Sequence, residues 1–217
     1  MIIETLGNGR YKTASASLLD NTVTPKRVGM YAEVFNLSVL NSKQYCVAVD
    51  VVGDKMKLLL NATSGFAGSM QANHVLSAKC LLGGFNVEGL DNRHIVCFAG
   101  GSGLAGIIPV VRHVLNNTSS IVDVIYLESD ASHDISIHYP ELYNDRVKLH
   151  FAATQGVLST NEHTPILGML TSLTGCQPIV FLQRPVYFAC GPKGLINRLK
   201  SALIPVHCDE HDFRLNF

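Results

Sequence analysis

The fold of this chain is decided by residues 95–115, IVCFAGGSGLAGIIPVVRHVL. Residues 95–99 form a continuous apolar run, which is typical of a buried parallel strand. The loop Gly100-Gly101-Ser102-Gly103 follows, and the apolar residues beyond it recur at helical spacing as far as Leu115. Glycines let a backbone approach a phosphate, and the free N–H groups of a first helical turn point at it. The stretch therefore predicts a strand–loop–helix unit that binds a nucleotide phosphate; a turn whose glycines only ease packing is the alternative.

A second unit of the same kind lies at residues 185–203, PVYFACGPKGLINRLKSAL. Its apolar strand breaks at Cys190-Gly191-Pro192 and leads into a helix. In an open parallel sheet, loops at the carboxyl ends of the strands form one crevice. The two units therefore predict one doubly wound sheet with a shared site.

In these two loops the chain resembles the ferredoxin–NADP reductase family. Gly100-Gly101-Ser102-Gly103 is similar to the family's pyridine-nucleotide phosphate loop, and Cys190-Gly191-Pro192 is similar to the motif that lies by the nicotinamide. The chain departs from the pattern at Gly106, where the family usually has proline; Pro109 comes three residues later. The resemblance implies a flavoprotein in which a β-barrel carries FAD and an α/β domain binds NAD(P)H, with Cys190 placing the nicotinamide over the flavin.

The residue pattern changes near residues 91–93. Short strand-like runs separated by Asn, Asp, Gly and Pro precede this point, which is typical of an antiparallel barrel. Strands alternate with helices beyond it, which indicates a parallel sheet. We therefore expect an FAD-binding antiparallel β-barrel over residues 1–92 and a Rossmann-like, NAD(P)-binding parallel α/β domain over residues 93–217. The expected strands are residues 11–18, 28–40, 44–52, 55–60, 75–82, 95–99, 122–127, 147–152 and 186–190, and the expected helices end near residues 116, 173 and 203.

The first half carries the family's main flavin motif in altered form. The family usually has Arg-x-Tyr-Ser, whose arginine contacts the flavin pyrophosphate, whose tyrosine packs on the isoalloxazine and whose serine donates to flavin N5. The matching residues are Lys43, Tyr45 and Cys46. Lysine keeps the charge without the bidentate fork, and a thiol is a weaker donor than a hydroxyl. The resemblance implies that these three residues contact FAD, with Cys46 at N5, although a plain strand explains them equally well.

Two further segments in the same order favour the flavin interpretation. Residues 65–70, GFAGSM, are similar to the family's second phosphate loop, which implies that Gly68 and Ser69 contact FAD at a helix start. Residues 82–85, LGGF, resemble a shortened form of the turn that ends the family's barrel.

The C-terminal segment HCDEHDFRLNF allows two interpretations. His207 and His211 are four residues apart, and on one helix they would share a metal. Pro205 makes a continuous helix there doubtful. The family ends in a short strand with an acid and an aromatic residue, which this segment resembles, so we expect Phe213 or Phe217 near the flavin and no metal site.

Glu128 ends the second strand of the expected nucleotide domain. In Rossmann-like sites an acid at this position accepts from the adenine ribose 2′-hydroxyl and repels a 2′-phosphate. No arginine lies close by in the sequence, so we expect NADH rather than NADPH. The alternative is that Glu128 and Asp130 are solvated loop acids.

Composition excludes several other classes. The formal net charge is zero, the basic residues are not clustered and tryptophan is absent, so nothing supports a nucleic-acid partner. The longest apolar stretch is too short and too broken for a membrane span, and the N-terminus has no signal-peptide pattern. The six cysteines form no C-x-x-C pair and have no iron–sulfur spacing. We expect a reduced, cytoplasmic protein whose electron acceptor is a separate molecule.

These observations favour a flavoprotein reductase that passes a hydride from NADH to FAD and then electrons to a ferredoxin, an oxygenase component or a small-molecule acceptor. The cofactors supply the chemistry, and the protein binds and orients them. The altered flavin motifs leave open a reductase-fold subunit with a binding or assembly role and no tightly bound flavin. Another nucleotide-binding α/β enzyme, such as a transferase, explains the glycine loop but neither the CGP strand nor the barrel.

Overall fold

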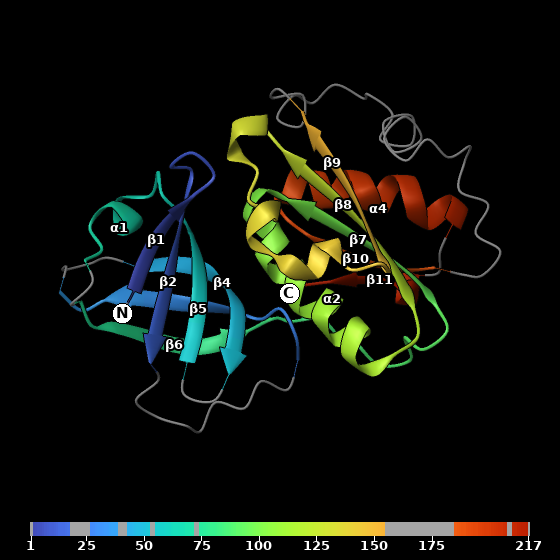
Figure 1. Ribbon diagram of the computed structural model, residues 1–217, viewed down its shortest axis with the longest axis horizontal. Helices are drawn as coiled ribbons and strands as arrows, with labels where there is room; N and C mark the ends of the chain where they lie inside the picture. Colours follow the sequence, from blue (N-terminus) through green and yellow to red (C-terminus); the bar gives the residue numbers. More distant parts are fainter. Residues whose placement is uncertain are drawn as a thin grey trace.

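The computed structural model describes residues 2–17, 27–38, 43–52, 55–71, 74–154, 185–207 and 210–216. Figure 1 shows these residues as two units side by side, one made of antiparallel strands and one made of parallel strands and helices. The expected order, an antiparallel barrel followed by a parallel α/β domain, is confirmed. The expected helix around residues 165–173 lies outside the described residues.

The first unit is a six-stranded antiparallel sheet with the strand order β1-β2-β5-β4-β3-β6. Small side chains such as Ala14 and Ala32 line its interior beside larger ones such as Met56 and Phe66. Along β5 the even-numbered residues from 56 to 60 face this interior, whereas Leu59 joins the core of the second unit. The elements are β1 Ile2–Leu6, β2 Tyr11–Ser17, β3 Tyr31–Asn36, β4 Lys43–Val52, β5 Lys55–Asn61, α1 Gly65–Gly68 and β6 Leu76–Leu82.

The second unit is a five-stranded parallel sheet with the strand order β11-β10-β7-β8-β9. The strand order reverses at the central strand β7: β8 and β9 follow on one side of it, and the chain then returns to place β10 on the other side. Strands β7 and β10 pair in parallel from Ile95↔Val186 to Ala99↔Cys190. The elements are β7 His94–Gly100, η1 Gly101–Gly103, α2 Leu104–Asn117, β8 Ile121–Glu128, η2 Ala131–His133, η3 Ser136–His138, η4 Pro140–Tyr143, β9 Val147–Ala153, β10 Val186–Cys190, α4 Lys193–His207, η6 Glu210–Asp212 and β11 Phe213–Leu215.

Helices α2 and α4 cover opposite faces of the parallel sheet (Figure 1). Along β7, Ile95 and Cys97 pack on the α2 side, and Val96 and Phe98 pack on the α4 side. This two-sided burial explains why the strand is a continuous apolar run. The expected helical face of α2 is confirmed, because its apolar residues from Leu104 to Val114 are buried.

The domain boundary, the end of α4 and the strand β1 remain to be compared with the expectations from the sequence. The first sheet ends at Leu82 and the second begins at His94, so the expected boundary between residues 92 and 93 falls in the connecting segment and stays a prediction. Helix α4 continues through Pro205 and ends at His207. His207 and His211 therefore do not share a helix. Strand β1 is an element that the sequence analysis missed.

The two units meet at Gly29, which precedes β3 and faces α2. Its φ of +66° is in the left-handed region, and a β-carbon there would lie 2.3 Å from the carbonyl oxygen of Gly106. Gly106 is the position at which the family usually has proline. Phe85, which pairs with Val28 in an isolated bridge, is fully buried beside this contact and packs edge-on against Phe188 at 5.3 Å. The barrel therefore lies directly on the start of α2, with no space for a side chain between them.

We expect Gly29→Ala to lower the free energy of unfolding by about 3 kcal/mol or more, because the substitution adds both backbone strain and a steric clash. Gly9→Ala is the matched control: its φ is +86°, but a β-carbon there meets nothing within 4 Å. The control should lose only about 1–2 kcal/mol. Urea denaturation of both variants measures the difference, and equal losses would show that the contact with Gly106 is not tight.

Candidate functional site

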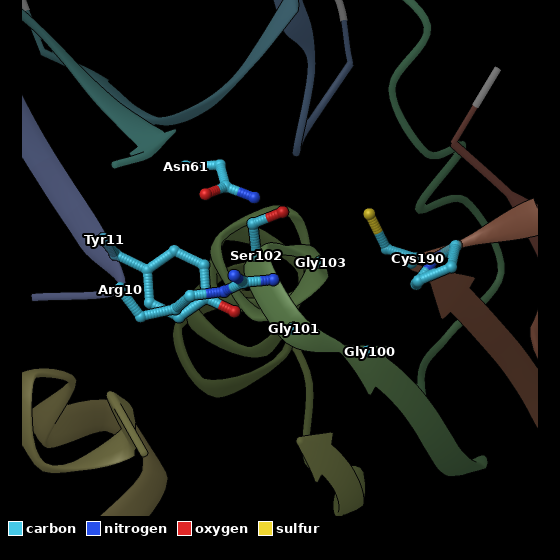
Figure 2. Close-up of a pocket in the computed structure, with 10 residues that line it drawn as sticks. Arg10, Tyr11, Asn61, Gly100, Gly101, Ser102, Gly103 and Cys190 are labelled. Atoms are coloured by element: carbon cyan, nitrogen blue, oxygen red, sulfur yellow. The ribbon is translucent and has the colours of Figure 1, made fainter. Parts of the chain in front are cut away.

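The site lies at the point where the strand order of the parallel sheet reverses. The loop after β7 and the loop after β10 leave the sheet side by side there, which is where open α/β sheets bind ligands. Together with the barrel they enclose a pocket of about 370 Å³ (Figure 2). This volume is in the range of small-ligand pockets. The lining residues are Arg10, Tyr11, Asn61, Gly100, Gly101, Ser102, Gly103, Cys190, Gly191 and Pro192.

The two loops that the sequence analysis singled out are therefore in contact. A β-carbon at Gly103 would lie 2.1 Å from the carbonyl oxygen of Cys190, and one at Gly100 would lie 2.6 Å from the Leu195 side chain. Gly101 has a φ of +55°, which favours glycine for conformational reasons. Packing therefore requires glycine at residues 100 and 103, and backbone conformation favours it at residue 101. These requirements agree with the alternative interpretation, a turn whose glycines only ease packing. Phosphate binding by this loop stays a prediction, now with a pocket beside it.

The barrel contributes three residues to the pocket, all of which the sequence analysis missed. Arg10 ends the turn between β1 and β2, Tyr11 begins β2, and Asn61 ends β5. The Oδ1 atom of Asn61 accepts from the backbone N–H of Thr63 at 3.0 Å and from its hydroxyl at 2.7 Å, so the amide nitrogen is the group left to face the pocket. These residues belong to no motif. The fold alone brings them to the glycine loop.

The pocket is rich in hydrogen-bond donors. The Arg10 guanidinium and the Ser102 hydroxyl approach it from opposite domains, and Figure 2 shows both near its centre, with the Cys190 sulfur at the far side. No carboxylate lies among the lining residues that the structure describes. A donor set without an acid suits an anionic ligand, and bidentate arginine is well matched to phosphate.

Glu128 does not line this pocket but lies directly behind the glycine loop. Its side chain is 3% exposed, and its Oε1 atom accepts hydrogen bonds from the hydroxyls of Tyr11 and Tyr126, the latter at 3.0 Å. The backbone N–H of Ser129 donates to Oε2 at 3.1 Å. Burial, reinforced by this carboxylate, raises the pKa of Tyr11 and of Tyr126 well above the usual tyrosine range, so both remain donors. Glu128 therefore joins the barrel to the α/β domain, and ribose binding by it stays a prediction.

Cys190 is a free thiol at the carboxyl end of β10 and is 9% exposed. Burial raises its pKa to about 11, against a smaller lowering by Asn216, whose Nδ2 lies 3.8 Å from the sulfur. The thiolate is the nucleophilic form of cysteine. At neutral pH Cys190 is therefore a thiol, which fits the expected role in positioning and not one in nucleophilic attack.

Asn216 also ties the end of the chain to the barrel. Its Nδ2 donates to the carbonyl of Gly29, and its Oδ1 accepts from the N–H of Gly84 at 2.7 Å. Phe213 lies in the core on the α4 side, with its ring 6.2 Å from that of Tyr187. Phe213 is therefore not at the pocket. Phe217 is the other aromatic residue expected near the flavin. It lies outside the described residues, so its position stays a prediction.

The expected flavin residues lie on β4 and α1. Lys43, Tyr45 and Cys46 are in β4 and pair with Phe35, Glu33 and Ala32 of β3; their side chains lie outside the description. Contact of these three residues with FAD stays a prediction.

The expectation for Gly68 and Ser69 was wrong in one respect, because they end α1 and do not begin it. The hydroxyl of Ser64 accepts from the Ala67 N–H at 3.2 Å and so caps the helix before Gly65. Ser69 is the C-cap, and its hydroxyl donates to the carbonyl of Phe66 at 2.9 Å. A β-carbon at Gly65 or Gly68 would meet nothing within 4 Å, and neither φ is in the left-handed region. The chain itself does not require glycine at these two positions, which is consistent with space kept for a ligand.

Outside the pocket, Asp123 bridges two histidines on the parallel sheet. Its carboxylate lies 2.6 Å from Nε2 of His94 and 2.8 Å from Nε2 of His150. Although burial opposes ionisation, these hydrogen bonds lower the pKa of Asp123 below its usual value. Within the described ranges, no group of three or more His, Cys, Asp or Glu residues is placed to hold a metal ion. None of the helices described is both long and apolar enough to cross a membrane.

No protein-family model and no curated protein sequence matches this chain. Solved structures do match. The ferredoxin reductase in carbazole 1,9a-dioxygenase superposes with a TM-score of 0.75 at 10% identity, over 99% of this chain and 66% of that chain. The chain has the fold of a ferredoxin–NADP reductase. The resemblance inferred from the two loops is thereby confirmed for the fold.

Two further structures show the same reductase fold. Ferredoxin–NADP⁺ reductase from Plasmodium falciparum matches with a TM-score of 0.69 at 11% identity, over 99% of this chain and 92% of that one. Phthalate dioxygenase reductase matches with a TM-score of 0.68 at 11% identity, over 99% of this chain and 65% of that one. The chain spans just under two thirds of the length of the two dioxygenase reductases.

In this reductase fold, we expect Tyr11→Phe to lower the free energy of unfolding by about 2 kcal/mol, because it removes a buried hydrogen bond to a carboxylate that joins the two domains. Tyr143→Phe is the matched control, since Tyr143 is 61% exposed and should change by less than about 0.5 kcal/mol. Thermal or urea denaturation gives both values. The account of Glu128 as a link between domains fails if the two variants are equally stable.

Proposed function

We propose that this chain is a flavoprotein reductase that binds FAD on the barrel and NADH at the pocket, and that donates electrons to a separate acceptor. The observation that carries the proposal is the meeting of two loops, Gly100–Gly103 and Cys190–Pro192, in one pocket that also contacts the barrel. A nucleotide held there would lie between the two domains. The fold supports the same function, because it is shared with reductases that use pyridine nucleotides.

The pocket suits the phosphates of a pyridine nucleotide. Its donors are the Arg10 guanidinium, the Asn61 amide, the Ser102 hydroxyl and the backbone N–H groups of the glycine loop. Cys190 lies at the opposite end, where its uncharged thiol and the following Gly191 offer a less polar surface. This polarity agrees with a dinucleotide whose phosphates lie on the glycine loop and whose nicotinamide lies against Cys190.

The choice of NADH rests on the acids that end β8. Glu128 is buried behind the loop, and Asp130 is exposed, with its pKa lowered by hydrogen bonds from Ser132. A 2′-phosphate on the adenine ribose would lie near negative charge at this end of the strand. NADPH is therefore the less favourable donor in our proposal.

The residues that would hold FAD are Tyr45, Cys46 and Lys43 on β4 and Gly68 and Ser69 at the end of α1. The open space at Gly65 and Gly68 is the observation that fits a phosphate group approaching the backbone. When bound, FAD would supply the hydride-accepting ring and the route by which electrons leave. The protein would contribute orientation: Cys46 and Cys190 would lie by the reacting atoms, and Asn216 fixes Cys190 and residue 216 against the barrel.

We propose a ferredoxin or an oxygenase component as the acceptor, with a small molecule as the further possibility. The matched structures are a ferredoxin reductase in carbazole 1,9a-dioxygenase and a reductase described as transferring electrons from pyridine nucleotides to a [2Fe-2S] centre. The second candidate function is an assembly subunit of the same fold without tightly bound flavin. Lys43 and Cys46 favour it, because both replace the stronger flavin contacts of the family.

We expect the gently purified protein to carry FAD without a covalent bond and to be reduced faster by NADH than by NADPH. Lys43 and Cys46 should make the flavin weaker-bound than is usual for the family. A visible spectrum, the quenching of added FAD fluorescence and anaerobic stopped-flow reduction test these points. Tyr45→Ala should lose FAD, whereas the exposed Tyr143→Ala should keep it. A colourless protein that does not quench the fluorescence of added FAD would support the assembly role. Faster reduction of the flavin by NADPH than by NADH would show that NADH is not the preferred donor.

We expect Cys190→Ala to fold and retain FAD but to slow hydride transfer about 10- to 100-fold, since a small misplacement of reacting atoms costs about that much. Cys97→Ala is the matched control, because Cys97 is a fully buried thiol of the same sheet outside the pocket. It should lose about 1 kcal/mol of stability and keep the parental rate. Single-turnover flavin reduction and thermal melting separate the two effects. A parental rate in Cys190→Ala would remove this residue from the active site.

A further inference from the structure

We propose that Arg10 binds the pyrophosphate of the pyridine nucleotide, so that the barrel as well as the α/β domain holds the nucleotide. The inference rests on the proposed function of the pocket. It adds a nucleotide-binding residue that lies far from both motif loops in the sequence.

The turn that carries Arg10 is held against the α/β domain. Gly7, Asn8 and Gly9 all have positive φ, and the N–H of Arg10 donates to the Gly7 carbonyl at 2.9 Å. A β-carbon at Gly7 would lie 2.8 Å from the carbonyl oxygen of His133, so the turn is packed tightly on η2. The carbonyl of Arg10 accepts from the N–H of Ala62 at 2.9 Å.

The neighbouring side chain completes the anchoring. Tyr11 is 3% exposed and donates to Glu128 at the end of β8. The backbone at residue 10 is therefore fixed relative to the glycine loop. A ligand held by Arg10 would not need to order this turn on binding.

The guanidinium of Arg10 has an unused donor at the pocket. Its Nε is buried and, among the residues that the structure describes, has no hydrogen-bond partner. A buried donor without a partner is costly, so such a group usually has a ligand. Figure 2 shows the side chain extending from the barrel towards Gly101 and Ser102. A phosphate oxygen on the glycine loop would supply the missing acceptor.

The charge balance of the pocket points to the same ligand. Within the described part of the chain, no acid lines the pocket and no ion pair involving Arg10 is found. Oε1 of Glu128, behind the loop, is already bonded to two tyrosines. The Arg10 guanidinium also interacts with the Tyr11 hydroxyl, but this hydroxyl is uncharged and Nε has no partner among the described residues. The positive charge therefore has no acidic partner among the described residues, and a guanidinium binds phosphate through two parallel hydrogen bonds.

No arginine lies close to Glu128 in the sequence, but the fold brings Arg10 to the glycine loop in front of it. A nucleotide offers two phosphate groups to it: the pyrophosphate and, in NADPH, the 2′-phosphate. The pocket favours the first, because Arg10 shares it with Gly100–Gly103, which follow β7, and not with the residues that follow Glu128.

The test is calorimetric titration of the FAD-loaded protein with ADP-ribose and with ADP-ribose 2′-phosphate. Both ligands carry the pyrophosphate and neither can donate a hydride, so the measurement does not depend on activity. We expect Arg10→Gln to lower the affinity for both ligands by the same factor, about 10- to 100-fold. Losing a hydrogen bond to a charged group usually costs about this much affinity. Lys57→Gln is the control: it removes one positive charge from an exposed position of β5, outside the pocket, and should leave both affinities unchanged.

Each other outcome decides the question. Unchanged affinity for both ligands in Arg10→Gln overturns the inference and leaves the proposed function standing. A loss confined to ADP-ribose 2′-phosphate assigns Arg10 to the 2′-phosphate and overturns the pyrophosphate assignment. A parent protein that binds neither ligand overturns the proposed nucleotide site and the inference with it. Arg10→Met, which keeps the apolar stem, replaces Arg10→Gln in the titration if thermal melting shows that the latter is unfolded.

Discussion

The site depends on the contact between Gly103 and the carbonyl group of Cys190. The two loops are so close that a side chain at residue 103 has no space. This approach follows from the pairing of β7 with β10, whose last residues leave the sheet together where the strand order reverses. One loop leads through η1 into α2, and the other presents a buried, uncharged thiol. The pocket between the two loops, with hydrogen-bond donors at one end and Cys190 at the other, results from this single close approach.

The barrel closes the pocket and is fixed by a small number of specific contacts. Glu128 accepts from Tyr11, Asn216 joins Cys190 to Gly29 and Gly84, and Gly29 lies against α2. Each contact involves a buried polar group or a residue with no space for a side chain. Such contacts specify one arrangement, because a small shift would leave a buried carboxylate or carbonyl without its partner. Arg10 and Asn61 are thereby held at the pocket although both belong to the barrel.

The sequence predicted the parts of this structure that depend on local pattern. The change from a continuous apolar run to helical spacing at residues 95–115 predicted β7 and α2, and the end of β10 at Cys190 was predicted correctly for the same reason. Gly68 and Ser69 were placed at a helix start because the loop resembled a motif, whereas the cap at Ser64 starts the helix earlier. Arg10, Asn61 and Asn216 could not be predicted, because each reaches the site through contacts between residues far apart in the chain. A buried role for Glu128 was equally hidden, since its partner Tyr11 is 117 residues away.

The central claim is that this pocket holds a nicotinamide against a flavin on the barrel. The most direct measurement is anaerobic single-turnover reduction of the FAD-loaded protein by NADH and by NADH deuterated at C4. The account predicts that the visible absorption of the flavin is lost and that deuteration slows this loss, because the hydride transfers between the two rings. A flavin that stays oxidised with NADH and with NADPH would contradict the account.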